Sequence, residues 1–263
     1  MVKGICKLCG KREDLCDKSH ILPKFCYKYL RAEDKSFTYF REGAKKSIGN
    51  EFYTEYESGI LCLDCENKRL GSLDSYGSTI INNEGFNEKL KFNFKETAEN
   101  KFLILNDNLY YDYKKYKLFL LSILWRTAIS SREAFKEVKL SHNIETDLKN
   151  MILNNDPGKE YEYPCGILLP PFETLFRKSK NFNPHITGFV MSPVATQINN
   201  VPAYLFVIMG TQYVFYINKE PKNDIFISTR HKELYMLINE KKDHAHLIQH
   251  RIIKPLKRVW SKK

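Results

Sequence analysis

Two pairs of cysteines have the spacing of metal ligands. Cys6 and Cys9 form one Cys-x-x-Cys motif, and Cys62 and Cys65 form a second one much later in the chain. Paired motifs of this kind typically place four thiolates around a structural zinc ion. Zinc at such a site would close a long loop that chain entropy otherwise leaves open, so we predict that these four cysteines bind zinc.

A rival ligand set lies within the first part of the chain. It combines three thiolates with one imidazole, in Cys6, Cys9, Cys16 and His20. This set would leave the second Cys-x-x-Cys motif without a role, so the four-cysteine set is favoured. Cys26 and Cys165 are instead expected to be buried as small hydrophobic side chains.

A single histidine lies between the two cysteine motifs and is the candidate chemical centre. His20 stands in the segment Ser-His-Ile-Leu-Pro at 19–23. Imidazole gains or loses a proton near neutral pH, so a histidine at this place suits proton transfer. The alternative is a histidine that is hydrogen-bonded inside the zinc unit and has only a structural role.

The composition indicates a basic globular protein. The chain of 263 residues is 43% hydrophobic, which is enough for a substantial core, and its net charge is +11. The excess of lysine and arginine is compatible with a polyanionic partner, although an ordinary basic solvated surface has the same composition. The 7 cysteines, an odd number with four in close pairs, fit metal binding in a reducing compartment better than a disulfide framework.

The sequence also bears on location. The first residues run directly into the first cysteine motif without an apolar signal segment. The longest apolar run, at 118–125, is far shorter than the roughly 20 residues of a membrane span. We therefore expect a cytoplasmic protein with no membrane association.

The elements that would position these residues form an α+β protein with three parts. Residues 1–85 carry the cysteine motifs, and apolar residues at helical spacing after Cys65 predict a helix that starts at the second motif. A Cys-x-x-Cys knuckle that leads into a helix is typical of a zinc-stapled treble clef.

The other two parts are predicted from their periodicity. Residues 86–155 contain a predicted strand, a core helix and a second helix, at 102–105, 110–130 and 140–153. Residues 156–263 are β-rich, and their short apolar runs predict an antiparallel sheet with strands at 166–170, 186–191, 204–209 and 213–217. A terminal helix is expected over 230–250, where His246 and His250 have helical spacing but lack a third metal ligand.

The order of these motifs resembles the treble-clef HNH nucleases, also called ββα-metal nucleases. The resemblance is carried by the first Cys-x-x-Cys motif, by Ser-His-Ile-Leu-Pro-Lys-Phe at 19–25 and by Cys-Leu-Asp-Cys-Glu at 62–66. A later Leu-Ser-Ile-Leu-Trp-Arg segment at 121–126 adds a similarity to bacterial zinc-finger proteins of HNH type, and its Arg126 is expected to pair with a carboxylate. The resemblance covers residues 1–130 and does not account for the C-terminal part.

The HNH resemblance implies roles for three side chains. His20 corresponds to the general base that takes a proton from the attacking water. Ser19 and Glu66 correspond to the positions that hold a catalytic divalent ion such as Mg²⁺, with serine where the family has an acidic residue and glutamate where it has histidine or asparagine. The asparagine that orients the base in the family has no assigned counterpart, and Asn50 and Asn67 are displaced candidates.

The predicted function is hydrolysis of phosphodiester bonds in DNA or RNA, with zinc as a scaffold. The resemblance also implies antiphage defence or a toxin-like effector. In that case the β-rich part would serve as a sensor or assembly surface, and the expected protein partners are further copies of the chain, in a homo-oligomer, or an activating protein. The alternative is a zinc-stapled nucleic-acid-binding or assembly protein without catalysis. Phosphate contacts are expected from four basic residues near His20, namely Lys24, Lys28, Lys68 and Arg69.

Overall fold

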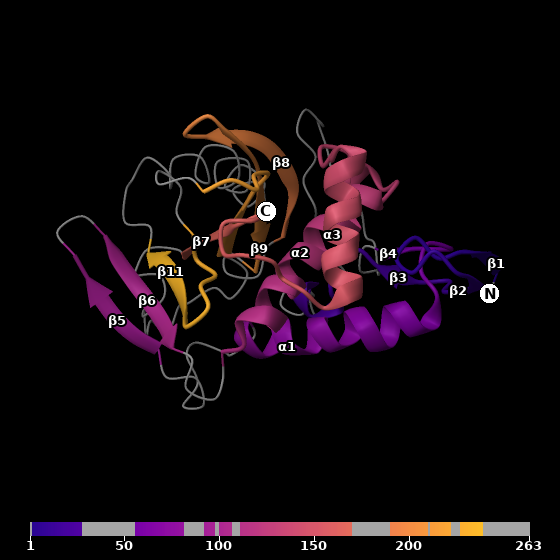
Figure 1. Ribbon diagram of the computed structural model, residues 1–263, viewed down its shortest axis with the longest axis horizontal. Coiled ribbons are helices and arrows are strands. Elements are labelled where there is room, and N and C mark those ends of the chain that lie inside the picture. The colour runs from indigo at the N-terminus through magenta and orange to yellow at the C-terminus, as the bar shows by residue number, and fades with distance from the viewer. Residues whose placement is uncertain are drawn as a thin grey trace, which may run out of the picture.

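The computed structural model describes residues 2–27, 56–81, 92–97, 100–106, 111–169, 190–209, 211–221 and 227–238. Within these segments the protein is α+β, as predicted (Figure 1). The helices are α1 (Gly71–Ile81), α2 (Tyr113–Ile129) and α3 (His142–Asn154). A π-helical segment, η2 (Asp64–Leu70), leads directly into α1, which confirms the helix expected after the second cysteine motif.

Seven strands form one sheet with the order β5-β6-β11-β7-β10-β9-β8. They are β5 (Phe92–Glu96), β6 (Lys101–Asn106), β7 (Cys165–Leu169), β8 (Met191–Ile198), β9 (Val201–Ile208), β10 (Thr211–Tyr216) and β11 (Glu233–Ile238). Neighbouring strands are antiparallel except β11 and β7, which are parallel. The strands predicted at 204–209 and 213–217 are confirmed as β9 and β10, which pair with each other, whereas the sheet is mixed and not purely antiparallel.

The terminal helix predicted over 230–250 is wrong where the chain forms β11. Leu234 and Met236 are buried and alternate with more exposed neighbours, which is the period of a strand. Pairing with β6 on one side and β7 on the other outweighs the helix propensity of Leu, Met and Glu. The rest of that predicted helix, with His246 and His250, lies outside the described residues, as does most of the strand predicted at 186–191.

The core helix is α2. The Asp112 side chain caps its N-terminus by accepting a hydrogen bond from the backbone N–H of the third helical residue at 3.0 Å. Its second half is apolar almost all round, and Phe119 and Trp125 are fully buried. Helix α1 packs closely on it, since a Cβ at Gly77 would lie 2.5 Å from the Phe119 ring.

Two short strand pairs form the N-terminal unit. The strands are β1 (Val2–Ile5), β2 (Arg12–Leu15), β3 (Ser19–His20) and β4 (Tyr56–Glu57). β1 and β2 are antiparallel, and the turn between them carries the first cysteine motif, with Gly10 at a φ of 74° that glycine adopts without strain. β3 and β4 are also antiparallel and place His20 opposite Tyr56.

One hydrophobic core reaches all three parts of the chain. It contains Leu8 of the N-terminal unit, Phe119 of α2 and Phe206 of β9. Cys26 and Cys165 are both buried in it, as predicted, and burial raises the pKa of each thiol. The division at residues 85 and 155 stays a prediction. Strands from both sides of the second boundary share one sheet. None of the helices in the described segments is long and apolar enough to cross a membrane.

Candidate functional site

The four predicted zinc ligands lie together. Their sulfur atoms are all within 4.8 Å of one another, and the Cys9 and Cys62 sulfurs are 3.9 Å apart. In the described part of the chain this is the one group of three or more histidine, cysteine or acidic side chains that could hold a metal ion. Cys16 and His20 do not belong to it, so the structure does not assemble the rival ligand set.

Backbone hydrogen bonds join the two cysteine motifs. Lys7 N donates to Ile60 O at 2.9 Å, and Cys62 N points at the Cys6 sulfur at 3.4 Å. Burial tends to raise the pKa of the Cys6 thiol, but such backbone donors outweigh it and leave that pKa below its ordinary value. Burial raises the pKa of the Cys62 and Cys65 thiols. The chemistry of this donor set suits zinc, which binds thiolates and stabilises their charge.

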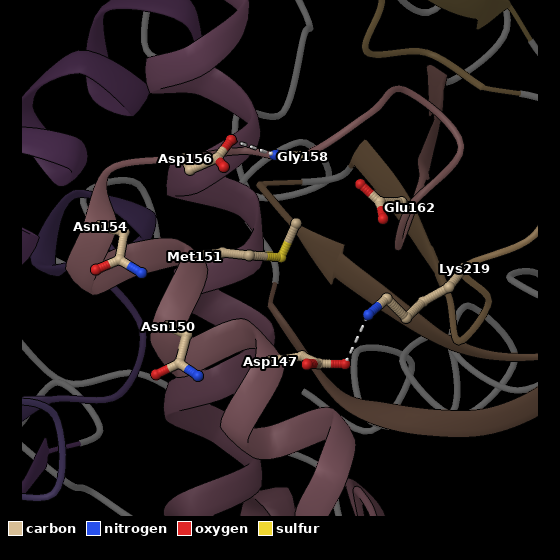
Figure 2. A pocket seen from close by; sticks show the side chains of 8 residues that line it. All are labelled: Asp147, Asn150, Met151, Asn154, Asp156, Gly158, Glu162 and Lys219. Carbon is tan, nitrogen blue, oxygen red and sulfur yellow. Dashed lines mark hydrogen bonds and ion pairs between the residues drawn. The ribbon is translucent and has the colours of Figure 1, made fainter.

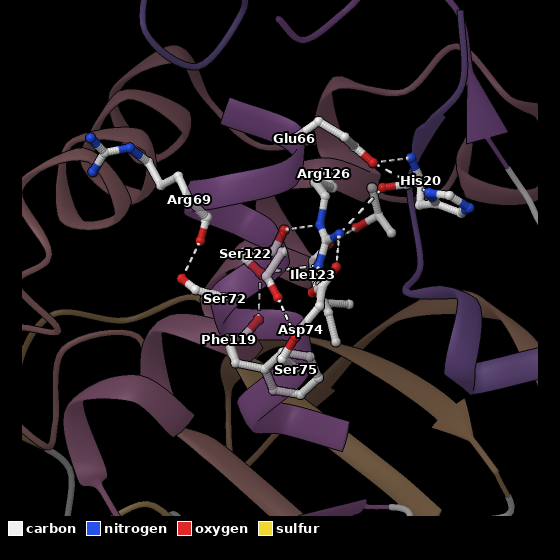
Figure 3. Close-up of polar contacts among 12 residues, drawn as sticks. His20, Glu66, Arg69, Ser72, Asp74, Ser75, Phe119, Ser122, Ile123 and Arg126 are labelled. Atoms are coloured by element: carbon white, nitrogen blue, oxygen red, sulfur yellow. Dashed lines mark hydrogen bonds and ion pairs between the residues drawn. The ribbon is translucent and has the colours of Figure 1, made fainter. Parts of the chain in front are cut away.

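His20 is in contact with Glu66, the residue that directly follows Cys65 of this cluster (Figure 3). The His20 backbone N–H donates to Glu66 Oε1 at 3.0 Å, and His20 Nδ1 lies 3.3 Å from the same oxygen. The two side chains are 31% and 11% exposed, so the carboxylate is nearly enclosed while the imidazole reaches solvent. Glu66 Oε2 is buried and has no hydrogen-bond partner. The carboxylate thus holds one edge of the imidazole and leaves one oxygen for a further contact.

Ser19 is fully buried next to His20 in β3. Its hydroxyl oxygen has no hydrogen-bond partner, so no hydrogen bond links it to His20 or Glu66. The structure therefore brings His20 and Glu66 together and leaves Ser19 as an adjacent buried oxygen. Asn67 is exposed on η2, and Asn50 lies outside the described residues.

Arg126 ties His20 to α1 and α2. Its fully buried guanidinium donates to both Asp74 oxygens, at 3.0 and 2.7 Å, and to the His20 carbonyl at 3.3 Å. Burial alone would lower the pKa of Arg126, but Asp74 outweighs burial and raises it. The expected carboxylate partner is confirmed. The hydrogen bond to the His20 carbonyl was not predicted. Its sequence signal is an arginine near the end of an otherwise apolar helix, because a buried charge needs fixed partners.

The basic residues expected near His20 have different surroundings. Arg69 donates to Leu153 O at 2.7 Å and so satisfies the carboxyl end of α3. Lys68 pairs with Asp64 at 2.9 Å on the surface. Lys24 is exposed, and Lys28 lies outside the described residues. Arg69 therefore has a structural role, and Lys24 and Lys68 face solvent.

A separate pocket of about 240 Å³ lies between α3, the segment that joins α3 to β7, and Lys219 after β10 (Figure 2). Its polar lining is Asp147, Asn150, Asn154, Asp156, Glu162 and Lys219. The carboxylates there are engaged by the protein itself, since Asp147 accepts from Tyr163 and Lys219, Asp156 from Gly158 N and Glu162 from Lys159 N. None of its lining residues belongs to the cysteine cluster or to the His20–Glu66 pair, so this pocket is not the candidate site.

Comparison with protein-family models, with curated proteins and with solved structures finds no match for this chain. The resemblance to HNH nucleases accordingly rests on the sequence motifs of this chain alone.

Proposed function

We propose that the protein is a zinc-stapled nuclease that hydrolyses phosphodiester bonds in DNA or RNA, with His20 as general base. The observation that carries the proposal is the contact between His20 and Glu66 directly beside the four-cysteine cluster. A histidine held by a carboxylate, partly open to solvent, is the arrangement expected of a base that must take a proton from water.

In this proposal zinc holds the frame of a treble clef. Cys6, Cys9, Cys62 and Cys65 would bind the ion and so fix the β1–β2 turn against the start of η2. Glu66 follows the last of these ligands directly, and the Leu15–Cys62 bridge joins β2 to the same place. The zinc scaffold therefore sets the distance between the helix start and β3.

Glu66 takes the orienting role that the sequence left unassigned. With Nδ1 protonated and donating to Glu66 Oε1, the His20 ring keeps a lone pair on Nε2 that can accept a proton from water. The carboxylate then stabilises the imidazolium that forms, and Arg126 holds the His20 carbonyl so that β3 keeps its position.

Two buried oxygens without partners, Glu66 Oε2 and Ser19 Oγ, are the donors that this site offers to a catalytic divalent ion such as Mg²⁺. Such an ion would stabilise the negative charge that develops on the phosphate and the leaving oxygen. With one carboxylate and one hydroxyl from the protein, substrate phosphate would have to complete the site.

The test is cleavage of single- and double-stranded DNA and RNA by the zinc-loaded protein, with and without Mg²⁺. His20→Ala and Glu66→Ala are each expected to lower the rate by about a hundredfold or more, the usual size of a general-base effect. His142→Ala is the matched control, because His142 is exposed at the start of α3. If His20→Ala retains zinc and the full wild-type rate, the assignment of the base is wrong.

A second function is favoured by Ser19. A neutral serine stands where an acidic ion ligand is expected, which suits a zinc-stapled nucleic-acid-binding or assembly protein that lacks catalysis. Tight binding of nucleic acid without cleavage under every ion condition would support this function. Growth arrest on expression of the wild type, relieved by His20→Ala, would instead support a nuclease that acts as a defence or toxin-like effector.

A further inference from the structure

Tyr56 lies beside the candidate base. It is directly opposite His20 in the antiparallel β3–β4 pair, so the two side chains project from the same face. Two cations lie over the half-buried Tyr56 ring: Lys18 Nζ is 5.3 Å from its centroid, and the Arg132 guanidinium carbon is 5.5 Å away. Both distances are within the range of a cation–π interaction.

Arg132 reaches this place because the turn after α2 is fastened to β4. Glu57 accepts hydrogen bonds from Ser130 Oγ at 2.8 Å and from the backbone N–H and hydroxyl of Ser131 at 2.9 Å each. Arg132 N in turn donates to Ser130 Oγ at 3.1 Å. The segment that carries Arg132 is thus fixed relative to Tyr56 and His20.

The two cations at this rim are accessible. Lys18 and Arg132 are exposed, whereas Glu57, the acidic residue of β4, has both carboxylate oxygens occupied by the serines. A cation that lies on an aromatic ring keeps its full charge, and the ring limits the side-chain freedom that an anionic ligand would otherwise have to restrict. Two ordered cations next to a half-exposed imidazole form a site for an anion.

We propose that Lys18 and Arg132 bind backbone phosphates of a nucleic acid on either side of the group presented to His20, with Tyr56 as the residue that positions both cations. The place of the reacting phosphate rests on the proposed function. Contacts from lysine and arginine to phosphates carry no sequence information, so binding at this rim is independent of base sequence.

The experiment measures binding of fluorescein-labelled oligonucleotides of two unrelated sequences to the zinc-loaded full chain between 50 and 300 mM salt, in a His20→Ala background that prevents cleavage. Lys18→Ala and Arg132→Ala should each weaken binding about five- to tenfold at about 0.1 M salt and lower the salt slope by about 1, equally for both sequences. Tyr56→Leu should reproduce part of the loss and Tyr56→Phe should not, because phenylalanine keeps the ring.

Lys136→Ala is the matched control, since Lys136 is an exposed lysine paired with Glu133 on the neighbouring turn. It removes the same charge and should leave the salt slope unchanged. Unchanged slopes in Lys18→Ala and Arg132→Ala, an equal loss in Lys136→Ala, or no binding by the parent protein would each overturn the inference. Equal competition by polyglutamate would show an acidic protein partner and overturn it as well.

Failure of this inference can be told apart from failure of the proposed function. Suppose that the wild type has no nuclease activity, while Lys18→Ala and Arg132→Ala weaken binding as described. The phosphate-binding rim is then supported and the catalytic proposal is wrong. If the wild type cleaves and both variants bind and cleave as it does, the rim is wrong and the base assignment is untouched.

Discussion

Glu66 Oε1 accepts from the His20 backbone N–H and lies 3.3 Å from Nδ1 of the His20 ring, so one oxygen contacts both the strand and the side chain. Rotation of the imidazole would break one of these contacts and keep the other. The protein therefore holds the ring at Nδ1 while the imidazole stays 31% exposed, as the proposed general base requires.

Arg126→Lys should destabilise the protein by about 3 kcal/mol. Lysine keeps the charge but cannot bridge both Asp74 oxygens and the His20 carbonyl, and a buried carboxylate–guanidinium pair is costly to break. Urea unfolding of the two proteins measures the difference. Arg12→Lys, on the exposed strand β2, is the conservative control and should change stability by less than about 0.5 kcal/mol. Equal midpoints for wild type and Arg126→Lys would contradict the role of the guanidinium.

Glu57→Gln should make stability less dependent on pH in the acid range. Burial tends to raise the pKa of Glu57, but hydrogen bonds from Ser130 and Ser131 outweigh it and hold the pKa below its ordinary value of 4.5. A lowered folded-state pKa contributes stability that is complete above the unfolded-state pKa and is lost as the pH falls through the folded-state value.

The wild type should therefore exceed Glu57→Gln by about 1 kcal/mol at neutral pH, a value reduced for partial exposure, and the gap should close below about pH 4. Thermal unfolding at several pH values measures it. A gap that stays constant down to about pH 3 would mean that the charge of Glu57 does not matter.

These contacts show which part of the site a sequence can predict. The cysteine spacing is local to each motif and zinc chemistry supplies the rest, so Cys6, Cys9, Cys62 and Cys65 could be grouped in advance. The motif resemblance assigned His20 and Glu66 to one site, but their direct contact depends on how β3 approaches η2, and no pattern within either segment encodes it. The same holds for Arg126, whose partners come from α1 and β3.

Helix α1 depends on a close approach to α2. The nearest atoms to an added Cβ at Gly77 are in the buried Phe119 ring, which cannot move aside cheaply. Gly77→Ala should therefore destabilise the protein by about 1–3 kcal/mol, although alanine improves helix propensity. Thr79→Ala, on the exposed face of the same helix, should change stability by less than about 0.5 kcal/mol. Chemical denaturation separates the two, and a stabilised Gly77→Ala would show that the packing is looser than described.

Elements were predictable where periodicity and end signals agree. α2 has an apolar run that begins after an Asp cap, and α3 ends at Asn155, whose φ of 53° is the left-handed conformation of a helix terminus. β11 was predicted as helix because its residues are good helix formers, and only the flanking strands, distant in sequence, make it a strand. A local pattern carries no information about such partners.

Metal removal should unfold the molecule as a whole and not only its N-terminal unit. The cysteine cluster, α2 and the sheet share one core, so losing the zinc frame removes support from all of them. A chelator should lower stability by about 5 kcal/mol or more and give a single thermal transition. Far-UV circular dichroism follows the thermal transition, and mass spectrometry measures the zinc content.

Two cysteine variants are the controls for that experiment. Cys62→Ser should bind no zinc, whereas Cys16→Ser should keep one equivalent, because Cys16 is buried but outside the cluster. The opposite result, zinc lost in Cys16→Ser and kept in Cys62→Ser, would favour the rival ligand set.

The position of β11 has a consequence for synthesis of the chain. β11 lies between β6 and β7 in the sheet, yet it is the last described strand in sequence. Until residues 233–238 leave the ribosome, the sheet can exist only as a β5–β6 hairpin and a separate group of β7 to β10. Helix α2 can form earlier, because its backbone hydrogen bonds are local and its partners α1 and α3 are already made. A translation product that ends before β11 would therefore expose two unpaired strand edges, which is the form most prone to aggregate.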